Sequence, residues 1–382
     1  MVNPHISKIF FTLFVVVFNA SLLSGQTSYV QKIDKSSVYA GIEVGSKGVK
    51  MSLLEINPND KDRSYNVMKD TSINTDFISF TQPTYLATLN ALNKLYEIAT
   101  VDFKIPGNHV FTAVSSGVNI QAAKENKLNW IEQLIGAFKF NYNEPDRKVT
   151  VIDVQEEARL SHLGIVPDSK RYNTFLIDIG SGNTKGGYFP NGNTKTFKLF
   201  QLSWGTKSTS NATDKRADGN NSLENFNKNL NRVLLGAENT EIAYAVNESG
   251  SYPLSDNVAF SGGIAWALAN LMYPELIDNA VVPVSYDEVV KFNDRILNNH
   301  ATLSDFYIVK SLTDSTLDAE TIGRTVKNVN KVFDQRALLA GTGLLLKIMR
   351  QFESANERKN FYFVKNGAVG WITAYVNQNF TN

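Results

Sequence analysis

The sequence contains no cysteine among its 382 residues. This absence excludes disulfide bonds, thiolate metal sites and a lipid-modified N-terminal cysteine. Histidine is scarce as well, and the spacing of His5, His109, His162 and His300 is not typical of metal ligands. We interpret each histidine as an ordinary surface or core residue.

The chain also lacks an excess of charge of either sign. Lysine and arginine number 38 and aspartate and glutamate 37, which gives a formal net charge of +1. No dense basic block is present, and this disfavours nucleic acid as a partner. Tandem repeats, coiled-coil heptads and low-complexity tracts are absent too. The length is sufficient for two domains with cores of their own.

No apolar run reaches the roughly 20 residues that a membrane span needs. The segment Ile9–Phe18 is mostly apolar, follows Lys8 and precedes small residues near Gly25. This pattern is typical of a secretory signal peptide, which we favour over a retained membrane anchor. Residues 1–25 are therefore predicted to be cleaved and residues 26–37 to form a polar tether. The mature protein would begin near Gln26 and work in the periplasm or outside the cell, without a permanent membrane span.

Two similar glycine-containing segments lie at domain-scale separation. Ala40–Lys50 reads AGIEVGSKGVK and Phe175–Lys185 reads FLIDIGSGNTK. In each, an apolar strand-like run with an acid leads into a Gly-Ser turn and a lysine, so backbone N–H groups can face an anion. One such turn is weak evidence, but two predict related half-domains around a phosphate-containing ligand. The candidate phosphate-binding residues are Gly45, Ser46, Lys47, Lys50, Gly180, Ser181, Gly182, Asn183 and Lys185.

Strand-like and helix-like segments alternate along the chain, which predicts an α/β fold. Pro83–Thr100 carries leucines at helical spacing, and Asn257–Gly263 reads as a strand that ends in a Gly-Gly turn. Asn211–Asn221 is polar and is expected to form an exposed loop. Gln155–Gly164 reads as a helix whose first turn contains Glu156 and Glu157. These acids either complement the helix dipole, or one of them holds a water molecule.

With these segments in place, the chain resembles the exopolyphosphatase and guanosine pentaphosphate phosphatase (Ppx/GppA) family, within the actin, hexokinase and Hsp70 superfamily. The resemblance extends from about Val38 to Val376. Its most specific element is Glu156–Gly164, which is similar to the family's Glu-Glu-Ala-Arg-Leu signature. Ile177–Gly182 resembles the second phosphate loop, and Ser261–Gly263 stands where the superfamily has a Gly-Gly turn.

The resemblance implies two actin-like (ribonuclease H-like) α/β lobes around an interdomain cleft. The first lobe would comprise residues 37–155 plus about 360–382, and the second residues 156–359. Gly45 and Gly180 would then face each other across the cleft.

The resemblance also implies a mechanism, in which an activated water attacks the terminal phosphoryl group of a phosphoanhydride chain. Glu157 would correspond to the base that orients this water, with Glu156 beside it. Glu43 and Asp178 would hold Mg²⁺ or another divalent cation, directly or through water. Gly262 and Gly263 would lie on the nucleotide or distal-chain side of the ligand.

Several positions depart from the family pattern. Glu43 replaces an aspartate and Asn119 replaces an arginine, while a serine and a glutamate of the second turn are replaced by Asn183 and Lys185. We favour a secreted hydrolase that releases phosphate from polyphosphate or nucleoside polyphosphates. The alternatives are a catalytically degenerate actin-like protein that binds an anion or nucleotide, and an apyrase-like nucleotidase. The sequence leaves a homodimer open.

Overall fold

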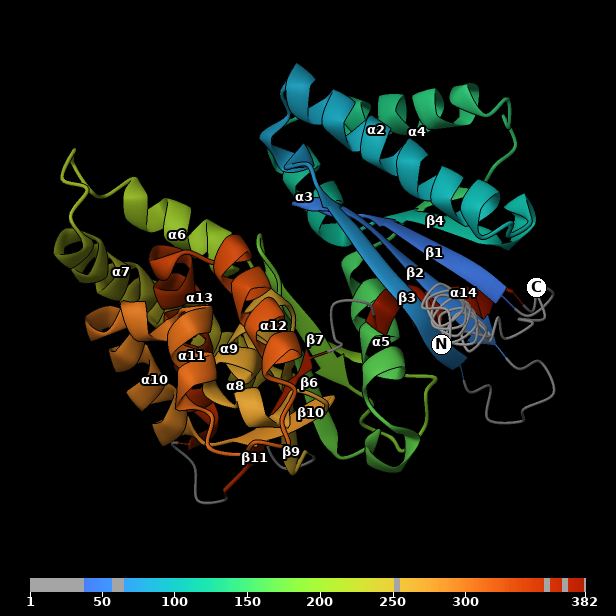
Figure 1. Cartoon of the computed structure of the whole chain (residues 1–382). Coiled ribbons are helices and arrows are strands. Elements are labelled where there is room, and N and C mark those ends of the chain that lie inside the picture. The colour runs from blue at the N-terminus through green and yellow to red at the C-terminus, as the bar shows by residue number, and fades with distance from the viewer. Residues whose placement is uncertain (1–37, 57–64, 251–254, 354–357, 366–369, 381–382) are drawn as a thin grey trace, which may run out of the picture. The chain divides into compact units, whose positions relative to one another are not determined.

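The computed structural model describes residues 38–56, 65–250, 255–353, 358–365 and 370–380. The predicted signal peptide and tether lie outside these ranges. The chain forms two β-sheets with helices packed against them, which confirms the predicted α/β class (Figure 1). Among the helices of the described ranges, none has the length and apolar character needed to cross a membrane.

The first sheet has the strand order β3-β2-β1-β4-β5. An antiparallel meander of β1, β2 and β3 is extended by the parallel neighbours β4 and β5. Nearly every residue of β1 is buried, as expected for a strand that is covered on both faces. The strands are β1 (Val38–Val44), β2 (Gly48–Ile56), β3 (Tyr65–Asn74), β4 (Val110–Val114) and β5 (Val149–Val151).

Helices from both ends of the chain cover the first sheet. One core cluster joins α2 and α4 to β1, whereas α14 packs on Leu54 and Ile56 of β2 through Val376. Helix α2 lies within one to three residues of the predicted span and begins at a capping box formed by Thr81. These helices are α2 (Gln82–Glu97), α3 (Ser116–Lys124), α4 (Leu128–Asn141) and α14 (Gly370–Asn379).

The second sheet has the order β10-β11-β9-β6-β7-β8, with β6, β9 and β11 parallel. The sequence predicts residues from about 360 in the first lobe, whereas Asn360–Val364 (β11) pairs in this second sheet. The apolar run of β11 suits a central parallel strand. The other strands are β6 (Thr174–Ile179), β7 (Thr184–Tyr188), β8 (Lys198–Leu202), β9 (Asn257–Ser261) and β10 (Val281–Val284).

A large apolar core joins the second sheet to its helices. Helix α13 contributes more buried residues than any other helix of this sheet, and close contacts at Gly341 and Gly343 let it lie against Ile264 and Leu234. The helices are α6 (Thr206–Asp214), α7 (Leu223–Ala237), α8 (Ala243–Ser249), α9 (Gly263–Met272), α10 (Tyr286–Asn298), α11 (Asp305–Ser311), α12 (Ala319–Val332) and α13 (Gln335–Glu353).

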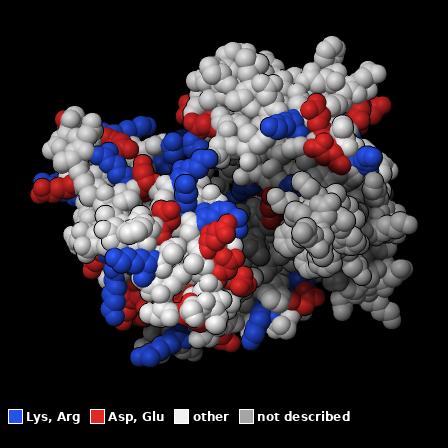
Figure 2. Space-filling model, viewed as in Figure 1, with Lys and Arg blue, Asp and Glu red and all other residues white. Residues whose placement is uncertain are grey.

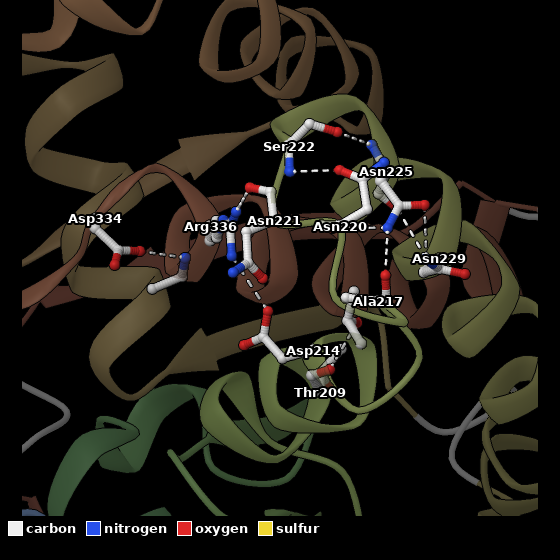
Figure 3. Close-up of polar contacts among 12 residues, drawn as sticks. Thr209, Asp214, Ala217, Asn220, Asn221, Ser222, Asn225, Asn229, Asp334 and Arg336 are labelled. Atoms are coloured by element: carbon white, nitrogen blue, oxygen red, sulfur yellow. Dashed lines mark hydrogen bonds and ion pairs between the residues drawn. The ribbon is translucent and has the colours of Figure 1, made fainter.

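The polar segment Asn211–Asn221 is a loop only in part. Its first residues complete α6, and the loop proper starts after Asp214. The side-chain amide of Asn225 donates to the carbonyl oxygens of Ala217 (3.0 Å) and Asn220 (2.8 Å), as Figure 3 shows. Asparagine thus closes this turn by replacing backbone hydrogen bonds.

Helix α5 (Val154–Ile165) packs against both α14 and β7. Its contact with α14 depends on two glycines that approach closely. A Cβ atom at Gly164 would lie 2.0 Å from the carbonyl oxygen of Gly370, and one at Gly370 would lie 2.2 Å from Ile165 Cγ1. Because α5 carries Glu157, this contact also positions the candidate site.

His162, on the same helix, is expected to make the stability of the folded protein sensitive to acid. Its ring is fully buried beside Phe189, and its Nε2 lies 3.0 Å from the carbonyl oxygen of Thr174. Burial lowers the pKa of His162 to about 4. The folded state therefore binds fewer protons than the unfolded state below about pH 6.5, so stability falls as the pH falls toward 4.

We expect His162 to account for a loss of about 2 kcal/mol in the free energy of unfolding between pH 7 and pH 5. His162→Gln, which can keep the hydrogen bond to Thr174, should lack this share of the pH dependence. Urea unfolding of both proteins across this pH range measures the difference. Parallel profiles for the two proteins would contradict the prediction.

Candidate functional site

The two glycine turns belong to hairpins with the same arrangement of charges. In the β1–β2 hairpin Glu43 lies opposite Lys50, and in the β6–β7 hairpin Asp178 lies opposite Lys185. Each hairpin thus places an acid on its first strand and a lysine directly across from it. The repeat seen in the sequence is therefore also a repeat of structure.

Each turn is closed by one backbone hydrogen bond. The N–H of Gly45 donates to Gly48 (2.9 Å), and that of Gly180 donates to Asn183 (3.0 Å). Other turn N–H groups are used by no hydrogen bond of the described residues, and such groups can bind an anion. They belong to Ser46, Lys47, Ser181, Gly182 and Asn183.

Both turns border the first turn of α3. A Cβ atom at Gly117 would lie 3.3 Å from Ser46 Oγ and 3.6 Å from Asn183 Oδ1. The sequence alone predicts no role for Ser115–Gly117. Their position directly after β4 could have indicated a functional role, because functional groups gather at the carboxyl ends of parallel strands.

Glu157 is buried at the centre of this region. It is 2% exposed, its Oε2 accepts from the N–H of Ser116 (2.6 Å), and its Oε1 lies 3.0 Å from Lys185 Nζ. Glu156, whose side chain is 35% exposed, instead pairs with Arg159 at 2.6 Å. The two acids diverge, because neighbours on a helix point about 100° apart.

Lys185 joins two acids. Its Nζ lies 3.0 Å from Glu157 Oε1 and 3.2 Å from Asp178 Oδ2, and the residue is buried. Burial acts to lower the pKa of Lys185, but Glu157 and Asp178 outweigh it, so this pKa is raised. Lys185 is therefore an ammonium ion at neutral pH, and the charge expected to meet phosphate is shared with two carboxylates.

Glu43 lies beneath the first turn. A Cβ atom at Gly45 would be 3.3 Å from Glu43 Oε1, and Oε2 has no hydrogen-bond partner within the described part of the chain. Burial raises the pKa of the Glu43 carboxyl, and Lys50 opposes this effect. Glu157 and Asp178 also act to raise the pKa of this carboxyl, and Lys185 acts to lower it. These charges, together with those of Glu43 and Lys50, form one electrostatic group.

The two glycines of the turn after β9 have different neighbours. Ser261 Oγ donates to Asp178 Oδ1 (3.3 Å), and Gly262 adopts a φ of +91° with its Cβ position 2.6 Å from the same oxygen. A side chain at Gly262 would thus be strained and would collide with Asp178. Gly263 lies against the Phe333 ring instead, outside this group.

Helix α6 supports the second turn. The N–H groups of Thr206 and Lys207 donate to the carbonyl oxygens of Gly180 (2.9 Å) and Ser181 (2.8 Å). Burial and the nearby Lys207 lower the pKa of Lys47. The ammonium of Lys47 forms an ion pair with Asp76. Over the face seen in Figure 2, basic and acidic side chains are interspersed.

The donor set does not fit the Mg²⁺ expected at Glu43 and Asp178. Mg²⁺ is usually held by one or two carboxylates together with water and phosphate oxygens. Within the described ranges, no three acidic or histidine side chains are grouped so that they could hold a metal ion without such ligands. Mg²⁺ prefers near-octahedral oxygen ligands, whereas here the Lys185 ammonium lies between Asp178 and Glu157. A second cation at Asp178 would be repelled by this ammonium.

No family model and no curated protein matches the sequence. The structure is similar to the Ppx/GppA family member from Aquifex aeolicus, with a TM-score of 0.60 and 16% identity over 90% of this chain and 98% of the other. It is also similar to an exopolyphosphatase from Cytophaga hutchinsonii, with a TM-score of 0.53 and 13% identity over 88% and 98%. The expected resemblance to Ppx/GppA proteins is thus confirmed, as a likeness of fold.

Proposed function

We propose that this protein is a hydrolase of phosphoanhydrides that releases phosphate from polyphosphate or nucleoside polyphosphates. One observation carries the proposal: two turns border the same helix start, close to the buried carboxylate of Glu157, and several of their N–H groups donate to no described residue. The turns would bind phosphate oxygens, and Glu157 would orient the attacking water. Phosphoryl transfer depends mainly on such positioning and charge neutralisation.

The contacts of Glu157 are compatible with this role. A carboxylate has about four acceptor positions, and Ser116 and Lys185 each use one. They would hold the carboxylate in place while a free lone pair accepts a proton from water. Glu156, paired with Arg159 on the outside of α5, would support the helix without entering the reaction.

The second candidate is a catalytically degenerate protein that binds an anion or nucleotide. It is favoured by the ion pair of Glu157 with Lys185, because a neighbouring cation makes a carboxylate a weaker base. An apyrase-like nucleotidase would differ from the first proposal only in its preference for nucleotides.

Phosphate release distinguishes these functions. Purified protein should be incubated with long-chain polyphosphate, ATP, ADP and guanosine polyphosphates, and free phosphate measured with malachite green. Binding of each compound should be measured in parallel by calorimetry. Release from polyphosphate supports the first proposal, and release from nucleotides alone supports the nucleotidase. Binding without release supports the degenerate protein.

We also propose that the protein is secreted and that its mature form begins near Gln26. The charged start, apolar run and small residues before this position support the proposal. The intact mass of natively produced protein tests it, and retention of residues 1–25 would contradict it.

A further inference from the structure

We propose that Lys185 is a built-in counter-cation, whose ammonium takes the place of a protein-bound divalent cation between Glu157 and Asp178. The inference deepens the proposed function, since it concerns the same site. It makes binding of the phosphate chain independent of a metal ion held by the protein.

The contacts of the ammonium carry the proposal. Lys185 Nζ lies at hydrogen-bonding distance from both Glu157 Oε1 (3.0 Å) and Asp178 Oδ2 (3.2 Å). An ammonium has three N–H donors, so one remains for a phosphate oxygen or a water molecule. Lys185 can thus bridge two carboxylates through hydrogen bonds and still offer one N–H to an anion, which is the position a bridging cation would have.

The strand pairing holds Lys185 in this position. Asp178 and Lys185 are register partners, and a Cβ atom at Gly186 would lie 2.0 Å from the carbonyl oxygen of Leu176. Strand β7 therefore lies tightly against β6 directly beside the lysine. Thr184 Oγ1 donates to the carbonyl oxygen of Trp204 (2.7 Å) and fixes the strand on its other side.

The other hairpin has the same design. Lys50 lies opposite Glu43 in the register of β1 and β2 and acts to lower the pKa of its carboxyl, although no ion pair of the described residues joins them. The carboxyl groups of Glu43, Glu157 and Asp178 thus lie in one electrostatic group with two lysines. Lys50 also acts to lower the pKa of Asp70, which burial raises. This group already contains the positive charge that a divalent cation would otherwise bring.

Mn²⁺ binding in the absence of substrate tests the proposal. Chelator-treated full-length protein should be titrated with Mn²⁺ and the free ion measured by electron paramagnetic resonance. We expect no Asp178-dependent Mn²⁺ site in the wild type. Lys185→Glu, which exchanges the ammonium for a carboxylate, should gain one Mn²⁺ site per chain, and Lys185→Glu/Asp178→Asn should lose it again.

Lys195→Glu is the matched control, because Lys195 is exposed on the surface and undergoes the same change of charge. It should bind no Mn²⁺. A stoichiometric Mn²⁺ site in the wild type that disappears in Asp178→Asn would overturn the proposal. A folded Lys185→Glu variant without a new site would also overturn it.

If Lys185→Glu fails to fold by circular dichroism, comparison of the wild type with Asp178→Asn decides the question alone. Because this readout does not involve turnover, lack of phosphate release would count against the proposed function and leave the Mn²⁺ result standing.

Discussion

Glu157→Gln is expected to lower the rate of phosphate release by about 10²–10⁴-fold, the usual contribution of a general base. Glutamine keeps the shape of the side chain and an oxygen that can accept from the N–H of Ser116. It removes the negative charge that polarises the attacking water. The loss should therefore appear in kcat, while the affinity for the phosphate chain stays close to that of the wild type.

The neighbouring acid provides the control. Glu156→Gln breaks a partly exposed pair with Arg159, so the rate should be unchanged and stability should change by less than about 1 kcal/mol. Circular dichroism and thermal unfolding must first establish that Glu157→Gln is folded, because it also alters a buried ion pair. Equal turnover by Glu157→Gln and the wild type would show that Glu157 is not the base.

Gly164→Ala is expected to reduce the free energy of unfolding by about 3 kcal/mol. The added Cβ would lie 2.0 Å from the carbonyl oxygen of Gly370, and a backbone atom cannot turn aside as a side chain can. Alanine normally stabilises a helix relative to glycine by about 1 kcal/mol, so a loss here would run against helix propensity. Urea unfolding measures the difference.

Gly136 on α4 is the matched control, since a Cβ atom there would meet nothing within 4 Å. Gly136→Ala should increase stability by up to about 1 kcal/mol. If Gly164→Ala behaves in the same way, α5 and α14 do not pack through this contact.

The hairpins could be predicted from the sequence because their information is local. In the glycine-containing segment Phe175–Lys185, a four-residue turn, 180–183, places Asp178 opposite Lys185 in the register of β6 and β7. The pairing of these residues was therefore available from the sequence, although we expected Lys185 to contact phosphate. The α/β class and the resemblance to Ppx/GppA structures are confirmed, and the residue roles stay predictions.

Contacts between distant segments could not be predicted in this way. The bond from the Ser116 N–H to Glu157 joins residues 41 positions apart, and no periodicity indicates it. The position of β11 was missed for a similar reason, because an apolar run does not specify which sheet it enters. Only tertiary packing decides between two sheets that both accept buried strands.

Helix α14 has a consequence for synthesis of the protein. Strands β1 and β2 are made well before the side chains that cover their second face, because these side chains, Ile372 and Val376 among them, belong to α14. Domains generally fold as units during synthesis, beginning at the N-terminus. Here one face of the first sheet stays uncovered until α14 has been synthesised, so its folding is expected to wait for that helix and to depend on protection by chaperones.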